Sequence, residues 1–224
     1  MWQALHAENQ DRNFSVVTVA MDSPEAARPW IEAVGPTYPC LIDRDHRVAE
    51  LYNMVNVPQA VWIDEAGLIV RPPENAGSSD AFRYMDRDTK QMTPEQVGER
   101  ESMKSNYVNA VRDWIAKGAE SEHVLDASVV RSRVRLPDDN IALAHAHFRL
   151  ARYLRREGDP DQAAVHFAKA SELHPDSWNI WRQAADKDET GLAVGPEFWA
   201  RVDALGDRPY HRPIDMGGVS PNNG

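Results

Sequence analysis

Cysteine is almost absent from this chain, which has only Cys40 among its 224 residues. An intramolecular disulfide needs two cysteines, so the sequence excludes a disulfide framework and any cysteine-rich metal site. Positive charge is also scarce. The chain has 25 Lys and Arg and 35 Asp and Glu, which gives a formal net charge of −10. Since phosphate surfaces are bound through an excess of Lys and Arg, we expect neither a nucleic acid nor a membrane surface as a partner.

Long apolar segments are lacking as well. No apolar run reaches the roughly 18 residues of a membrane span, and residues 1–6 lack the basic, apolar and small-residue order of a signal peptide. We therefore expect a cytoplasmic location. The length favours two domains over one.

Motifs for metals and cofactors are missing too. His145 and His147 are two positions apart on a predicted helix and face different ways, while His166 and His174 have no partner at ligand spacing. The chain also has no Gly-rich phosphate loop. We therefore expect no metal site and no cofactor.

The first half of the chain alternates strand and helix patterns. Residues 14–21 form an apolar, β-branched run, which predicts a central strand buried on both faces of a parallel sheet. Ser23 and Pro24 then predict a helix start, and Gly35 its end. The expected inner face of this helix consists of Ala26, Pro29, Trp30 and Ala33.

The following segments continue this order. Residues 39–43 predict a short strand, and residues 48–52 a short helix with an inner face of Val48, Leu51 and Tyr52. Residues 59–63 and 67–71 predict an antiparallel hairpin, followed by an irregular segment at 72–80. Thr93 and Pro94 begin a long helix, whose apolar stripe is formed by Tyr107, Val108, Val111, Trp114 and Ile115. Four tryptophans on such stripes are expected in the core: Trp30, Trp62, Trp114 and Trp199.

The segments 38–43 and 48–52, which lead into Val57 and Pro58, resemble the redoxin branch of the thioredoxin superfamily. This branch holds TlpA- and ResA-like thiol-disulfide oxidoreductases and the AhpC/TSA-related antioxidant peroxiredoxins. The resemblance covers about residues 1–117. It implies an α/β, thioredoxin-like, three-layer αβα sandwich, incomplete at its N-terminus, which we expect as a domain at 1–120. It also implies a cis peptide bond before Pro58. The substrate-contacting loop would consist of Val57, Pro58 and Gln59, where the family usually has Thr or Ser in place of Gln59.

The family's first strand and its Cys-x-x-Cys precede the residues that align with 1–10. By this resemblance no catalytic residue lies in the chain, and we expect the natural protein to carry about 30 to 60 further residues upstream. The alternative is a divergent fold in which another strand fills the gap. Without the central strand, the strands at 14–21 and 59–63 expose edges. We therefore expect the 224-residue chain to be poorly soluble or oligomeric.

Cys40 has two interpretations. It is a peroxidatic or sensor thiol, or it is a structural cysteine in the core. No basic residue next to it and no helix N-terminus lowers its pKa in the sequence pattern, and cysteine is among the most buried residue types. We favour the structural interpretation.

The second half resembles a tetratricopeptide repeat over residues 144–177. The matching positions are Leu150, Ala151, Gly158, Ala163, Phe167, Ala170 and Pro175. Trp181 and Ala185 open a second, incomplete repeat, and Phe198, Trp199, Val202 and Leu205 mark one more amphipathic helix. We expect an all-α, tetratricopeptide-like helical domain at 136–208 and an extended or disordered tail at 209–224. A single repeat cannot bury a core alone, so these helices must pack against another part of the protein or another subunit.

Five arginines gather in this acidic chain on the repeat and the helix after it: Arg149, Arg152, Arg155, Arg156 and Arg182. Arg152, Arg155 and Arg182 are candidates for a groove that binds a peptide through its carboxylates. The alternative, which we favour, is a solvated helix face paired with nearby Asp and Glu.

Two functions follow from these patterns. The first is a thioredoxin-family oxidoreductase, acting on disulfides or peroxides through an upstream cysteine, with a helical repeat that binds a protein or peptide partner. The second is a non-catalytic thioredoxin-fold scaffold that serves protein binding through its tetratricopeptide module. DNA upstream of the Met1 codon would discriminate them, since an in-frame cysteine motif supports the enzyme.

Overall fold

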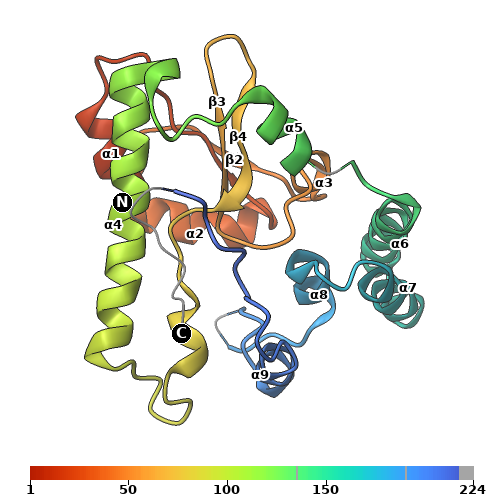
Figure 1. Cartoon of the computed structure of the whole chain (residues 1–224). Helices are drawn as coiled ribbons and strands as arrows, with labels where there is room; N and C mark the ends of the chain where they lie inside the picture. The colour runs from red at the N-terminus through yellow and green to blue at the C-terminus, as the bar shows by residue number, and fades with distance from the viewer. Residues whose placement is uncertain (135, 190, 217–224) are drawn as a thin grey trace.

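The computed structural model describes residues 1–134, 136–189 and 191–216. The last eight residues, which we expected to be disordered, lie outside the described residues. The N-terminal half mixes strands with helices, and the C-terminal half is helical (Figure 1). Figure 1 shows the long helix α4 (Pro94–Lys117) along one side of the molecule and the hairpin of α6 (Asp139–Arg156) and α7 (Pro160–Leu173) at the opposite side.

The strands of the described residues form two separate two-stranded sheets. β1 (Thr18–Ala20) pairs in parallel with β2 (Cys40–Ile42), and β3 (Gln59–Ile63) pairs antiparallel with β4 (Ile69–Asn75). β1 and β3 are not hydrogen-bonded to each other. The sheet of an αβα sandwich is therefore present as two pairs, with an unpaired edge on each strand.

Two strand predictions need correction. The strand predicted at 14–21 is only three residues long and half-buried, because β1 has one neighbouring strand and no second strand covers its other edge. The segment predicted to be irregular at 72–80 begins as an extension of β4, which runs through Pro72 and Pro73 to Asn75. Prolines are tolerated there because β4 pairs on one side only.

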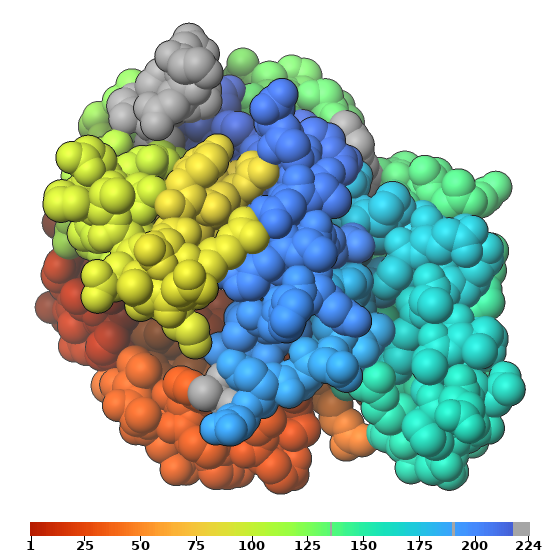
Figure 2. Space-filling model, turned by 90° about the horizontal axis from the view of Figure 1, so that it is seen from below, coloured from red at the N-terminus to blue at the C-terminus, as the bar shows by residue number. Residues whose placement is uncertain are grey.

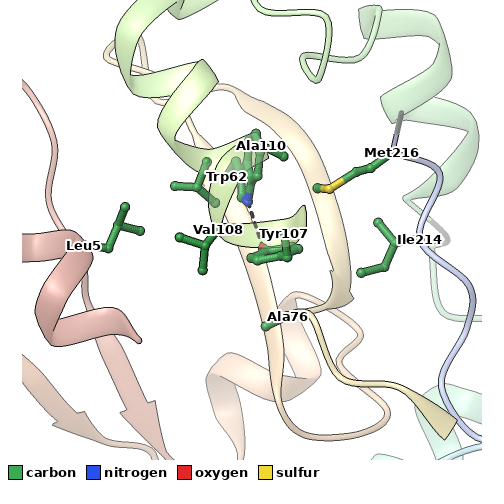
Figure 3. Packing of buried hydrophobic residues seen from close by; sticks show 9 residues of the cluster. Leu5, Trp62, Ala76, Tyr107, Val108, Ala110, Ile214 and Met216 are labelled. Atoms are coloured by element: carbon green, nitrogen blue, oxygen red, sulfur yellow. Dashed lines mark hydrogen bonds between the residues drawn. The ribbon is translucent and has the colours of Figure 1, made fainter. Parts of the chain in front are cut away.

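The main core lies between the β3–β4 hairpin and α4 (Figure 3). Thr93 caps the start of α4, as predicted, and forms a capping box with Gln96. In the middle of α4 Tyr107 is fully buried, and its hydroxyl accepts a hydrogen bond of 2.9 Å from Nε1 of Trp62. The helix α1 (Trp2–Glu8) adds Leu5 to this core.

The C-terminal tail completes the same core. Ile214 and Met216 are buried against the cluster around Tyr107 (Figure 3). The described part of the tail thus docks as extended chain, one of the two alternatives for this segment. Its anchor is Arg71, only 1% exposed, which donates to the Asp215 carbonyl at 2.9 Å and forms an ion pair with Glu74.

The predicted inner face of α2 (Pro24–Val34) is wrong. Ser23 caps the helix and Gly35 ends it with a φ of 59°, both as predicted. However, the four apolar positions at 26, 29, 30 and 33 face solvent, and Trp30 is 65% exposed. The two-stranded sheet beneath α2 covers only a narrow face, which contains Ala27 and Ile31.

The face predicted for α3 (Arg47–Leu51) is also wrong in part. Leu51 is 74% exposed, and Ala49 is the buried residue of this helix. A helix of five residues has a single turn, so it can turn only one or two side chains inward. Val48 and Tyr52 are half-buried.

The helices α6 and α7 form the antiparallel hairpin that the repeat pattern predicts. Gly158, with a φ of 86°, makes the turn between them. Ala151, Ala163 and Ala170 are fully buried and let the helices approach closely. Leu150 is 42% exposed, in contrast to the prediction for its position, because Phe148 fills the space next to Phe167 at a centroid distance of 5.8 Å.

A third cluster closes the helical half. Phe198 and Val202 of α9 (Pro196–Asp203) are buried, as the apolar pattern predicts, and pack with Trp178 of α8 (Trp178–Ala184) and with Tyr210. Trp114 packs against the main core and Trp199 against this third cluster. The short helix α5 (Ala127–Arg133) was not predicted and lies on β4. Among the described helices, none is both long and apolar enough to cross a membrane.

Candidate functional site

The loop before β3 contains the residues expected to contact substrate. The Val57–Pro58 peptide bond is cis, the form implied by the resemblance. Val57 is 43% exposed and Pro58 is also exposed. Gln59 does not reach outward, because its Oε1 accepts a hydrogen bond of 3.0 Å from the backbone N–H of Val55. The Gln59 side chain therefore stabilises the loop to which it belongs.

Asn56 is the central residue of this loop, and sequence reasoning missed it. It is buried, and its Oδ1 accepts hydrogen bonds of 2.9 Å from the backbone N–H of Val57 and 2.9 Å from Nη1 of Arg182. The hydroxyl of Tyr210 donates to the same oxygen at 3.4 Å. No local pattern could have found Asn56, since two of its partners are more than 120 residues away in the sequence.

The helix α8 holds the same loop through Asn179. Its backbone N–H donates to the Val55 carbonyl at 3.1 Å, and its Nδ2 donates to the Met54 carbonyl at 2.8 Å. Asn179 is 5% exposed. Four consecutive residues before Pro58 thus contact the helical half or one another, so the cis-proline loop belongs to the contact surface between the two halves.

Arg182 lies among three aromatic side chains. Its guanidinium carbon is 5.9, 5.8 and 5.9 Å from the ring centroids of Trp178, Phe198 and Tyr210. Such cation–π contacts stabilise a half-buried positive charge. Arg182 is not among the residues that line a pocket with Arg152 and Arg155. The three predicted groove residues are therefore divided between two places.

The pocket that contains Arg152 and Arg155 has a volume of about 280 Å³. It lies where the start of α2 and the loop after β2 meet the C-terminal end of α6. Figure 2 shows the neighbouring surfaces, with the helical hairpin on one side and the N-terminal segments, coloured orange, on the other. The lining residues are Asp22, Ser23, Glu25, Arg44, Arg152, Arg155, Arg156 and Gln183.

Arg152 and Arg155 hold neutral oxygens within this pocket. Arg152 donates to Gln183 Oε1 at 2.9 Å and to the backbone carbonyl of Arg44. Arg155 donates to the Gln183 carbonyl at 2.8 Å, and its guanidinium carbon lies 4.3 Å from the centroid of the Phe167 ring. Burial lowers the pKa of both arginines. The neutral acceptors thus replace only part of the hydration that the two guanidinium groups lose on burial.

The other two arginines of α6 form ion pairs with the N-terminal half. Arg149 contacts Glu50 at 2.6 Å, and Arg156 contacts Asp45 at 2.9 Å. The side chains are 24 to 56% exposed, so each pair contributes about 0 to 1 kcal/mol to the free energy of unfolding. The favoured sequence interpretation, a helix face paired with acids, describes these two arginines.

His46 is buried between the same two halves. Its ring lies 5.0 Å from that of Phe148, and its Nε2 has no hydrogen-bond partner. Burial, followed by the positive charge of Arg152, lowers the pKa of His46 to about 4. The imidazole is therefore neutral at pH 7. His46 is the N-cap of α3, and its φ of 57° lies in the left-handed region.

The histidines of the repeat pair across α6 and α7. Nδ1 of His147 lies 2.7 Å from Nδ1 of His166, and the rings of His145 and His174 are 6.1 Å apart. Sequence spacing did not reveal these two pairs, because helix packing brings the rings together. Within the part of the chain that the structure describes, no group of three or more His, Cys, Asp and Glu could hold a metal ion.

Cys40 is half-buried in β2 and lies outside the three core clusters, which corrects the expected core position. Thr18 donates to its Sγ at 3.1 Å, and the thiol donates to the Tyr38 carbonyl at 3.6 Å. The short β1–β2 pair leaves this strand partly open to solvent, which is why the thiol is not fully buried.

Comparison with known families finds one match in each half of the chain. Residues 1–71 match the AhpC/TSA family, and residues 144–186 match the tetratricopeptide repeat. No curated protein and no solved structure matched the chain. The chain therefore joins a thioredoxin-like redoxin segment to a tetratricopeptide-like helical segment. The first match suggests thioredoxin-family redox function, and the second suggests interaction with a protein.

Proposed function

We propose that this chain, a redoxin segment joined to a tetratricopeptide-like segment, serves a thiol-disulfide or peroxide-reducing reaction whose cysteine lies outside these 224 residues. The observation that carries the proposal is the exposed cis-proline loop at Val57 and Pro58 within a redoxin match. A substrate chain would contact the loop there, while the helical segment binds a protein or peptide partner. We place the reaction in the cytoplasm.

The proposal divides the chain into three parts. The redoxin part takes residues 1–120, the helical part residues 136–208, and the tail begins at 209. The contacts of Asn179 and Arg182 with the loop support a shared role, because they fix the cis-proline loop against the helical part. The helical segment would then position the substrate loop in addition to binding its partner.

A non-catalytic scaffold is the second candidate function. Two observations favour it: the chain holds one cysteine, and Gln59 is turned onto its own loop instead of outward. In this case the redoxin fold only supports the helical segment, and the arginines of α6 or α8 contact the partner.

Insulin reduction and peroxide consumption test the proposal. We expect no dithiol turnover from the 224-residue chain, because one thiol cannot close the intramolecular disulfide that releases a mixed-disulfide product. The matched control is Cys40→Ser. The longest in-frame product of the gene is then assayed in the same way. Turnover that depends on a cysteine outside these residues supports the enzyme, and turnover by the short chain that exceeds Cys40→Ser contradicts the proposal.

If the longest product contains no further cysteine, the scaffold is favoured over the enzyme. Arg182→Ala provides a second readout for the positioning role of α8. We expect it to change the KM for a protein disulfide more than the kcat, since Arg182 acts on the substrate loop through Asn56.

A further inference from the structure

Three arginines at the junction of the two halves have no carboxylate partner. Arg149 and Arg156 on the same helix form ion pairs, but among the described residues Arg44, Arg152 and Arg155 form none. Acidic residues outnumber Lys and Arg in this chain, whose formal net charge is −10. All three line the same pocket of about 280 Å³.

Arg44 differs from the other two. Its backbone carbonyl accepts from Arg152, but its guanidinium group makes no hydrogen bond or ion pair within the described part of the chain. It reaches the pocket from the loop after β2, opposite α6. Positive charge therefore enters the pocket from both halves of the protein.

The two acids of the pocket are already engaged by the backbone. Oδ1 of Asp22 accepts a hydrogen bond of 2.8 Å from the N–H of Ser23. The carboxylate of Glu25 accepts from its own backbone N–H and from Ser23, and these hydrogen bonds, with a smaller effect of the positive charges of Arg44 and Arg28, lower its pKa. Both acids lie next to the Ser23 cap at the start of α2, where carboxylates are stabilised. They leave four guanidinium groups against two carboxylates around the pocket.

Gln183 adds a neutral donor to the pocket. Its Oε1 accepts from Arg152 and its backbone carbonyl from Arg155, so the side-chain amide is oriented with its NH₂ group away from the Arg152 contact. An amide NH₂ donates two hydrogen bonds and accepts none. The pocket thus combines charged and neutral donors.

We propose that this pocket binds a phosphate group, free or carried by a small molecule, between Arg44 of the N-terminal half and Arg152 and Arg155 of the helical half. Arg152 and Arg155 use some of their N–H donors on Gln183 and Arg44, but Nε of Arg152 is buried without a hydrogen-bond partner. Guanidinium groups bind phosphate through parallel N–H donors, and a phosphate has more oxygens and more charge than a carboxylate to offer several guanidinium groups at once. No aromatic side chain lines the pocket, so nothing there would stack on a nucleobase. The site is independent of the redox reaction proposed above.

Binding at this site would also join the two halves. Arg44 belongs to the redoxin segment and the other two arginines to the tetratricopeptide-like segment. A ligand held by both stabilises their docked arrangement by mass action, so the thermal unfolding temperature must rise with its concentration.

The test is a calorimetric titration of the whole chain with inorganic phosphate, and separately with the monoester O-phosphoserine, at constant ionic strength. Sodium acetate at the same ionic strength is the control for general screening. We expect saturable binding of at least one phosphate probe and a higher unfolding temperature, and no such effect of acetate. Binding of phosphate but not of the monoester would assign the free ion, and the reverse would assign a small-molecule ester.

Arg44→Gln decides the location of the site. It removes the charge of an exposed side chain that forms no ion pair among the described residues, so the unfolding temperature without phosphate should change little, while phosphate binding weakens by about tenfold. Arg28→Gln is the matched control, because Arg28 lies on the same helix as Glu25 but pairs with Glu32 at the surface. Absence of saturable binding, or equal loss in both variants, would overturn the proposal.

Discussion

Nη1 of Arg182 lies 2.9 Å from Oδ1 of Asn56, and this hydrogen bond joins the helical half to the loop that carries the cis-proline. The same oxygen accepts from the N–H of Val57. One buried side chain therefore orders the candidate substrate loop and ties it to the repeat. The redoxin and tetratricopeptide-like segments share this contact instead of acting as separate modules.

Asn56→Ala should lower the free energy of unfolding by about 2 kcal/mol, because Arg182 and the N–H of Val57 lose their acceptor in a buried place. Urea unfolding followed by tryptophan fluorescence measures this change. The control is Asn109→Ala on the exposed face of α4, where a change within about 0.5 kcal/mol is expected. Equal effects of the two substitutions would show that Asn56 does not anchor the loop.

Gly77→Ala should destabilise the chain by more than about 2 kcal/mol, through overpacking added to backbone strain. A Cβ at this position would lie 2.9 Å from Cβ of Tyr107 and 3.2 Å from Cα of Lys104, and the φ of Gly77 is 81°. Gly158→Ala is the matched control, because its φ is 86° but no atom lies within 4 Å of the added Cβ. Only the strain of about 1 to 2 kcal/mol remains there. Thermal and urea unfolding compare the pair, and a larger loss at Gly158 would contradict the close approach of the segment after β4 to α4.

Acid should destabilise the fold through His46. Burial lowers its folded-state pKa from 6.5 to about 4. Between these values the unfolded chain binds more protons, so the contribution is complete above pH 6.5 and is lost as the pH falls toward 4. It amounts to up to about 3 kcal/mol. The charge of Arg152 lowers the pKa of the ring further and the charges of Asp43 and Asp22 raise it, but burial has the largest effect.

His46→Asn checks this prediction, since Asn tolerates the left-handed φ of position 46 and does not titrate in this range. The unfolding free energy of the wild type should fall more steeply from pH 7 to pH 4.5 than that of the variant. His211, whose pKa burial also lowers to about 4, leaves a remaining slope in the variant. Identical slopes in both proteins would contradict a neutral, buried His46.

The chain should self-associate at micromolar concentration. Trp30 and Val34 on α2 are 65% and 66% exposed, and Leu41 on β2 is 52% exposed, which leaves apolar surface beside unpaired strand edges. Light scattering should report particles larger than the 25.2 kDa monomer. Trp30→Glu should reduce association, and Tyr84→Glu, at a tyrosine that is 71% exposed on η1 (Asp80–Tyr84), should leave it unchanged. A monodisperse monomer would contradict this expectation.

Local sequence patterns determined several helix boundaries. The Ser23 cap and Gly35 end of α2, the Thr93 start of α4 and the Gly158 turn all follow from side chains that bond to, or free, the backbone within a few residues. The close helix pair around Ala151 and Ala163 likewise follows from residue size at fixed spacing. Such features depend on neighbours that the sequence itself places close together.

Only the tertiary structure decided which helix faces are buried and which residues each arginine contacts. The apolar stripe with Trp30 faces solvent because the sheet beneath α2 has two strands, and strand number is not a local property. Arg44 and Arg155 reach one pocket, and Arg182 reaches Asn56, across sequence separations of more than 100 residues. The sequence indicated that the arginines gather on the first helix of the repeat and on the helix after it. Which of them pair with acids, stack on aromatic rings or remain without a carboxylate depended on how the two halves dock, since charge contacts are set by distance in space.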